Sequence, residues 1–168
     1  MTIKNSELTD IPIIYDLYRM ATAYMKSKNQ VHWPEFPKDL ITTEIEENRQ
    51  WKLLIEDKIA CIWATTLNDE LIWGTKNEPS LYIHRIATNP EFRGQNLVSK
   101  IIDWANDFGK NRNLKNIRMD TVGLNKGLIG HYEKLGFTFL GANQLENTNG
   151  LPEHYQKGEV CYFQKDII

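Results

Sequence analysis

The first third of the chain spaces its apolar residues in a pattern that is typical of helices. Between residues 10 and 27 they recur every three or four positions, which is the spacing of one helix face. A shorter helix is predicted for residues 38–48. The connection at residues 29–37 loses this period, contains two prolines, and carries Trp33 and Phe36 among its apolar residues. We therefore expect two helices joined by an apolar-rich loop.

Strand-like runs alternate with turns and helices in the rest of the chain. A hairpin is predicted where two runs rich in β-branched and aromatic residues flank Asp57-Lys58. Residues 67–79 are typical of a loop, although the apolar residues 71–73 could extend a neighbouring strand. The other predicted elements are helices at residues 97–111 and 125–135 and strands at residues 3–5, 51–56, 59–66, 81–88, 116–122, 137–140 and 160–164.

These elements predict an α+β fold in a single domain that spans residues 1–168. The segment from residue 81 to residue 135 alternates strand, helix, strand and helix. We expect a central mixed, mostly antiparallel sheet of six or seven strands, flanked by about four helices. A chain of 168 residues is long enough to bury a hydrophobic core as one domain.

The composition is that of an ordinary soluble globular protein, with 41% hydrophobic and 25% charged residues. The formal net charge of −2 argues against nucleic acid as the main partner. No apolar run approaches the length that crosses a membrane, and the first residues lack the apolar segment of a signal peptide. Cys61 and Cys161 lie in strand-like runs, so buried, inert thiols are favoured over a disulfide or a nucleophile. A reducing, cytoplasmic location is the default expectation.

A glycine-containing turn separates the strand at residues 81–88 from the helix that follows it. Arg93-Gly94-Gln95-Asn96 leads directly into that helix. The first amides of a helix have no partner inside the helix, and the helix dipole adds partial positive charge at the same end. Such a turn can hold a phosphate or pyrophosphate without a basic protein surface. The sequence therefore predicts an anion-binding turn here.

This turn is the first of three motifs that together resemble the GNAT superfamily of N-acetyltransferases. Residues 93–98 (Arg-Gly-Gln-Asn-Leu-Val) are followed by Asn125 and then by residues 132–137 (Tyr-Glu-Lys-Leu-Gly-Phe), in the family's order. The family pattern is Arg-x-x-Gly-x-Gly/Ala, and the chain departs from it with Asn96 and Val98. Asparagine is the residue after glycine that best tolerates a left-handed backbone. Valine places a β-branched side chain where the family keeps a small one.

The resemblance implies an enzyme that moves acetyl from acetyl-CoA to a primary amine of a small molecule or peptide. The amine would attack directly, without a covalent enzyme intermediate. A non-catalytic coenzyme-A-binding sensor or regulatory module is the alternative, and a nucleotide-binding protein with the same anion turn is a more distant one. The resemblance assigns to the cofactor the backbone of Ile86, Ala87 and Thr88, the turn residues Arg93, Gly94, Gln95, Asn96, Leu97 and Val98, and Asn125, which could also act only as a helix N-cap.

The resemblance also gives Tyr132 the role of the general acid that reprotonates the departing thiolate. The pKa of a phenol, ~10, is close enough to the ~8.5 of a thiol for this transfer, although a core aromatic is the alternative. Many relatives carry a basic carboxylate on the strand at residues 81–88, and this chain has none there. His84 is the titratable residue on that strand, and its ordinary pKa suits a base. Asp120 and a chain of water molecules are the rivals.

The acceptor side is predicted from the resemblance as well. In the family, the connection between the first two helices forms one wall of the acceptor site, so Trp33 and Phe36 are expected to line it. Packing onto the sheet edge is the alternative. The four histidines show no metal-ligand spacing, so no metal is predicted. The expected partner is a small-molecule or peptide amine rather than nucleic acid or a membrane, and a homodimer stays open.

Overall fold

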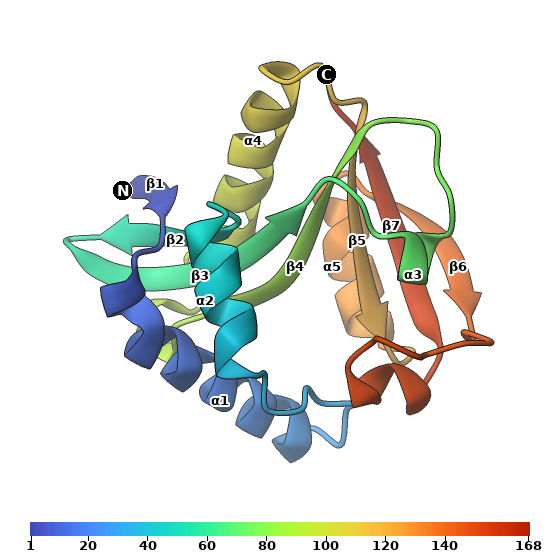
Figure 1. Ribbon diagram of the computed structural model, residues 1–168, viewed down its shortest axis with the longest axis horizontal. Coiled ribbons are helices and arrows are strands. Elements are labelled where there is room, and N and C mark those ends of the chain that lie inside the picture. The colour runs from blue at the N-terminus through green and yellow to red at the C-terminus, as the bar shows by residue number, and fades with distance from the viewer.

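The computed structural model describes residues 1–168, which fold around one seven-stranded sheet. The strands lie in the order β1-β2-β3-β4-β5-β7-β6 (Figure 1). Neighbouring strands are antiparallel except β4 and β5, which are parallel. The predicted α+β fold with a mixed, mostly antiparallel sheet is therefore confirmed. The strands are β1 (Thr2–Asn5), β2 (Gln50–Ile55), β3 (Lys58–Thr66), β4 (Ser80–Thr88), β5 (Asn116–Val122), β6 (Thr138–Asn143) and β7 (Val160–Asp166).

Five α-helices and three short 3-10 helices connect these strands, one α-helix more than expected. No helix is both long enough and apolar enough to cross a membrane. The α-helices are α1 (Ile11–Ser27), α2 (Lys38–Glu46), α3 (Glu70–Trp73), α4 (Leu97–Lys110) and α5 (Lys126–Lys134), and the 3-10 helices are η1 (Leu8–Asp10), η2 (Pro90–Phe92) and η3 (Glu153–Gln156).

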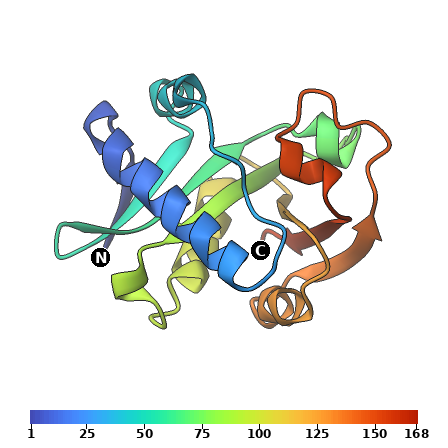
Figure 2. The same cartoon turned by 90° about the horizontal axis from the view of Figure 1, so that it is seen from below.

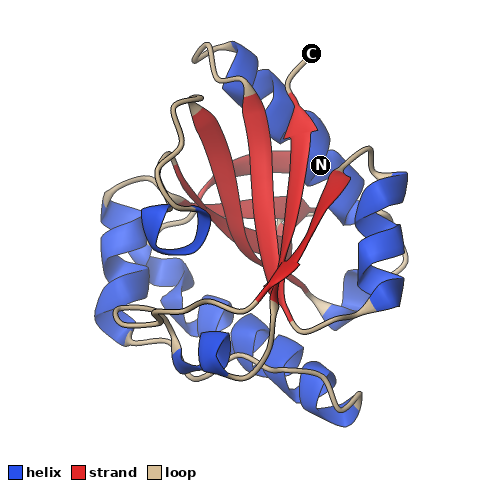
Figure 3. Cartoon of the chain, turned by 90° about the vertical axis from the view of Figure 1, so that its right-hand side faces the viewer, coloured by secondary structure: helices blue, strands red, loops and turns tan.

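Helices cover both faces of the sheet (Figures 2 and 3). On one face α4 and α5 pack over a core that includes Ile101 and Trp63, both fully buried. On the other face α1 and α2 pack over a second core that includes Ile14 and Ile62. Adjacent residues of β3 thus enter different cores, because successive side chains of a strand point to opposite faces.

β4 and β5 are paired only where the two strands begin. Their pairing runs from Ser80 with Asn116 to Tyr82 with Arg118. Beyond that point the two strands separate (Figure 1), whereas β4 remains paired with β3 as far as Thr88. The C-terminal halves of β4 and β5 therefore flank an opening in the sheet.

The prediction for residues 71–73 is wrong, because they belong to neither a loop nor a strand but to the one-turn helix α3. Ile72 and Trp73 are consecutive and both buried in one cluster. A strand would point them to opposite faces, whereas a helical turn lets both pack on the same side. Gly74, with φ of +66°, ends the helix.

The hairpin turn lies one residue earlier than predicted. Glu56 and Asp57 both have positive φ, of 49° and 61°, and Ile55 pairs with Lys58. This is the backbone of a two-residue turn whose twist matches that of the strands.

The two cysteines are buried and unpaired, as expected. Burial raises the pKa of Cys61 to about 11, which keeps it a thiol at neutral pH. Neither residue is set up as a nucleophile in this environment.

Leu81 of β4 is fully buried, whereas Leu140 of β6 is 52% exposed. We expect Leu81→Ala to lower the free energy of unfolding by about 2–5 kcal/mol, because it removes core contacts and leaves a cavity. The matched control Leu140→Ala should change it by less than about 1 kcal/mol. Urea unfolding measures both values, and similar losses for the two variants would contradict this core.

Candidate active site

The opening between β4 and β5 leads into a cavity of about 850 Å³. Its walls come from the C-terminal halves of both strands, the α1–α2 loop, the start of α5 and the segment around η3. The α1–α2 loop passes beside η3 (Figures 1 and 2), and a Cβ on Gly158 would lie 3.4 Å from Val31 of that loop. Segments that are far apart in the sequence therefore enclose one space.

The predicted site residues fall into two adjoining groups. The turn residues, with Ala87 and Thr88, lie outside the cavity, where β4 continues towards α4. The predicted site residues that line the cavity are Trp33, Phe36, His84, Ile86, Asn125 and Tyr132.

The turn before α4 has the backbone that its sequence suggested. Asn96 is in the left-handed region, with φ of 55° and ψ of 38°, and Gly94 has φ of 81°. The Asn96 side chain makes no capping hydrogen bond, so it leaves the first amides of α4 available to an anion. A Cβ on Gly94 would meet nothing within 4 Å, so the turn is open on that side.

Two residues of the turn region are placed by packing. Val98 lies against the core beneath α4, so its branched side chain is accommodated there. Leu97 is 3% exposed and packs in the same core.

Arg93 is exposed, and its guanidinium lies 4.6 Å from the centre of the Tyr24 ring in α1. Arg93 is thus free to meet a phosphate at the surface.

The end of β4 offers a free backbone edge towards β5. Ala87 pairs with Ile62 and Thr88 with Cys61 on the β3 side, but no residue of β4 beyond Tyr82 pairs with β5. An extended ligand can bind such an edge as an added strand does.

Asn125 is the N-cap of α5. Its side-chain oxygen accepts a hydrogen bond from the Leu128 amide at 3.1 Å, while the residue also lines the cavity. The capping role is present, and a contact with the cofactor stays a prediction.

Tyr132 is both a core aromatic and a cavity residue. Its ring packs against Phe137 and Phe163, and only 8% of the residue is exposed. Its hydroxyl makes no hydrogen bond within the protein. Burial raises the pKa of Tyr132 above its ordinary value, with smaller contributions from Cys61 and Asp120. The phenol therefore keeps its proton at neutral pH, and it is a weaker acid than the free phenol on which its predicted role rested.

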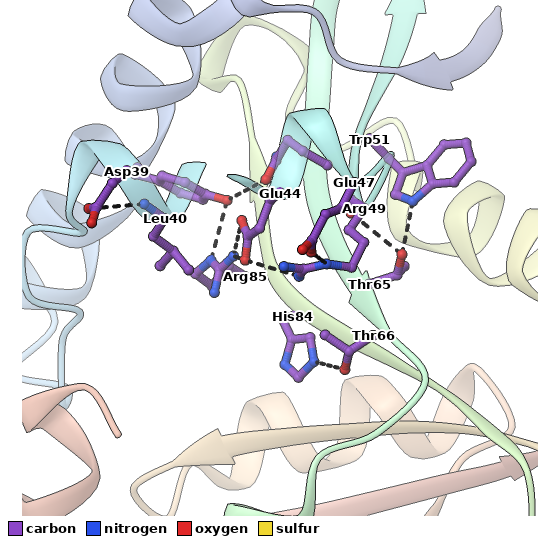
Figure 4. Close-up of polar contacts among 12 residues, drawn as sticks. Asp39, Leu40, Glu44, Glu47, Arg49, Trp51, Thr65, Thr66, His84 and Arg85 are labelled. Atoms are coloured by element: carbon purple, nitrogen blue, oxygen red, sulfur yellow. Dashed lines mark hydrogen bonds and ion pairs between the residues drawn. The ribbon is translucent and has the colours of Figure 1, made fainter. Parts of the chain in front are cut away.

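His84 does not have the ordinary pKa on which its predicted role rested. It lies deep in the molecule, and its exposed part faces the cavity. Burial, with the charges of Arg85 and Arg49, lowers the pKa of His84 to about 3. Its Nε2 lies 2.8 Å from the Thr66 hydroxyl (Figure 4). The imidazole is thus neutral and a weak base.

Two carboxyl groups face His84 across the cavity. The Tyr155 hydroxyl donates a hydrogen bond to Asp120 at 2.7 Å. Burial raises the pKa of Asp120 to about 6, although this hydrogen bond acts to lower it. Burial raises the pKa of Asp69 to about 7, and the nearby Asp120 charge adds to the increase. One ligand atom from each of Asp69, His84 and Asp120 lies within 4.8 Å of the others. Such a group can share a proton or hold an ammonium group.

The sequence interpretation missed Asp69. The available signal was local, because a run of polar residues ending in Asp69-Glu70 before three apolar residues is typical of a helix start. Nothing local pointed to its proximity to Asp120, 51 positions later.

Trp33 and Phe36 of the α1–α2 loop pack on α1 and also lie in the wall of the cavity, and a contact with the acceptor stays a prediction. Their rings pack on Tyr18 of α1, with centroid distances of 5.8 and 5.3 Å. Both also line the cavity, although Phe36 is only 4% exposed. Trp33, which is more exposed, is better placed to meet a ligand.

Comparisons with known proteins show that the chain is similar to N-acetyltransferases. The uncharacterized N-acetyltransferase YesJ of Bacillus subtilis (strain 168) is 29% identical over 108 residues, 61% of this chain and 60% of YesJ. The probable N-acetyltransferase camello of Xenopus tropicalis is 21% identical over 114 residues, 64% of this chain and 51% of camello. The chain therefore spans between half and two thirds of these relatives.

A crystal structure of a GNAT-family acetyltransferase from Listeria monocytogenes 4b F2365 shares the fold. It is 22% identical, with a TM-score of 0.75 over 98% of this chain and 94% of that one. The family model described as the Acetyltransferase (GNAT) family matches residues 14–137, a stretch that includes the turn before α4 and all of α5. The chain belongs to the GNAT acetyltransferase family.

Proposed function

We propose that the protein transfers an acetyl group from acetyl-CoA to a primary amine. The observation that supports this proposal is that β4 connects two features of the molecule, the turn before α4 and the cavity. β4 leads at its end to the uncapped N-terminus of α4, and the same strand forms a wall of the cavity that holds Tyr132 and Asp120. A long ligand with an anionic part and a reactive end fits such an arrangement.

The residues of the turn and of β4 suit coenzyme A. The diphosphate would accept hydrogen bonds from the amides of residues 94–98, where no side chain caps α4. The amide groups of the pantetheine arm would pair with the free edge of β4 at residues 86–88. Asn125 would contact the same arm from the start of α5.

The transfer itself is a direct displacement at the thioester. The amine nitrogen forms a bond to the carbonyl carbon, the carbon–sulfur bond breaks, and coenzyme A leaves as a thiolate. Tyr132 donates its proton to that sulfur and regains one from solvent. The nitrogen gives up a proton to a base, so that an amide and a free thiol result.

Asp120 is the better base of the two rivals from the sequence. Its pKa, raised by burial to about 6, lies near neutral pH, whereas burial lowers the pKa of His84 to about 3. Asp69 lies next to Asp120 and can pass the proton on towards solvent. His84 would then act as a neutral hydrogen-bonding neighbour rather than as the base. Trp33 and Phe36 would provide the apolar wall along the acceptor.

Thiol release from acetyl-CoA with a panel of primary amines tests the proposal. Tyr132→Phe should lower kcat by about ten- to a thousandfold, because it removes a proton donor used in the transition state. Calorimetry should find its affinity for acetyl-CoA nearly unchanged. The control Tyr162→Phe changes a residue that does not line the cavity and whose hydroxyl donates to the Ile72 carbonyl, so its kcat should stay close to the wild-type value.

Full activity of Tyr132→Phe would return that residue to a packing role. Tight binding of acetyl-CoA without thiol release for any amine would instead favour the non-catalytic alternative.

Asp120→Asn tests the base through the pH dependence of kcat/KM. The wild-type carboxyl is protonated and inactive below its pKa of about 6, so the wild-type advantage over the variant should grow as pH rises and level off above it. Dividing the two profiles cancels the ionisation of the acceptor amine. His84→Gln is the matched control and should keep the wild-type rise near pH 6. A constant ratio of wild type to Asp120→Asn across pH 5–8 would exclude Asp120 as the base.

A further inference from the structure

A bulge in β4 places an arginine in the wall of the cavity. The register between β3 and β4 shifts between Ile62 and Ala64, and Arg85 opposite this shift has φ of +51°. In a regular strand neighbouring side chains point to opposite faces, and a bulge re-aims one of them. His84, Arg85 and Ile86 accordingly all line the cavity.

The Arg85 guanidinium is held on three sides. Its Nη2 donates to both oxygens of Glu44 at 2.5 Å, and its Nε donates to the Tyr18 hydroxyl at 3.4 Å. The Phe36 ring centre lies 5.1 Å from the guanidinium carbon. No protein group accepts from the third nitrogen, Nη1, and Figure 4 draws no contact to it. A rigid cation therefore has one nitrogen, with two N–H donors, left for a ligand.

One buried carboxylate lies between Arg85 and a second guanidinium group. Glu44, with 4% of its side chain exposed, lies between Arg85 and Arg49, whose Nη1 is 3.7 Å from the same carboxylate. The second partner of Arg49 is Glu47, whose side chain is 54% exposed and therefore screened by water. Two guanidinium groups thus meet at one buried carboxylate, and the carboxylate that balances the second of them is at the surface.

His154 also lies in the wall of this cavity. Only 7% of it is exposed, and its buried Nδ1 has no hydrogen-bond partner. Burial, followed by the Arg85 charge, lowers the pKa of His154 to about 4, so its imidazole is neutral.

The cavity therefore has a cationic side and an acidic side. Arg85 forms the first, and Asp69 with Asp120 forms the second, where the proposed function places the amine. We propose that Arg85 binds a carboxylate of the acceptor, so that the acceptor is an amino acid or a similar amine with a carboxylate. This inference rests on the proposed function for the position of the amine. A polyamine lacks the anionic group and would leave the free guanidinium nitrogen without a partner.

Matched pairs of amines that differ only by the carboxylate test this subsite, such as tyrosine with tyramine and lysine with cadaverine. The wild-type protein should show kcat/KM at least about tenfold higher for the carboxylated members, because a site built to hydrogen-bond a group rejects the analogue that lacks it. Arg85→Gln should remove this preference, mainly by raising the KM of the carboxylated member, and leave the decarboxylated member within about threefold.

A second variant separates recognition from folding, because Arg85→Gln alone leaves Glu44 buried without its main partner. The double variant Glu44→Gln/Arg85→Gln removes both charges and should lose the preference in the same way. Equal losses for both members of each pair would show that Arg85 only supports the fold, and the proposal would fail. A preference that survives in the double variant would overturn it too.

Binding gives a readout that needs no turnover. Ligand-observed NMR with coenzyme-A-saturated protein should detect tyrosine and not tyramine, and Arg85→Gln should abolish the tyrosine signal. Selective tyrosine binding without acetyl transfer would support the subsite and contradict the proposed function alone. Acetyl transfer to tyramine and tyrosine at equal rates, with equal binding, would support the function and overturn the subsite.

Discussion

The early end of the pairing between β4 and β5 is the constraint on which the candidate site depends. Arg118, in the last pair, is 4% exposed and donates to the Tyr82 hydroxyl and to Gln164, each at 2.9 Å. These bonds satisfy donors of a buried arginine and hold the strands together at this point. Beyond them β4 stays with β3, and β5 stays with β7. Each strand therefore keeps one partner and turns a free edge towards the cavity.

The depth of this opening also sets the acid–base behaviour of the residues inside it. Burial disfavours the charged form of any group, so it lowers the pKa of His84 and raises that of Asp120. Near neutral pH the pKa values therefore favour a carboxyl on β5 over the imidazole on β4 as the proposed base. The same environment keeps Tyr132 protonated. In the proposed mechanism, one desolvated space therefore holds both the proton donor and the proton acceptor.

The parts of the fold that sequence could predict are those with local causes. The turn at Asn96 follows from the tolerance of asparagine for a left-handed backbone, and the N-cap at Asn125 follows from its side chain. The periods of the long helices and strands are likewise local, whereas the short apolar run in α3 was ambiguous. The meeting of Asp69 with Asp120 and the re-aiming of Arg85 depend on tertiary packing. No hydrophobic period or sequence motif indicates these two features. The pKa of a buried side chain also cannot be predicted before its burial is known.

The most direct test of the central claim is a crystal structure of the protein with coenzyme A. The proposed site requires the diphosphate at the amides of residues 94–98, the pantetheine arm along β4 at residues 86–88, and the sulfur at the cavity near Tyr132. Coenzyme A bound in that position would support the proposed acetyl transfer. A diphosphate bound elsewhere on the molecule, with the opening between β4 and β5 left to solvent, would contradict it.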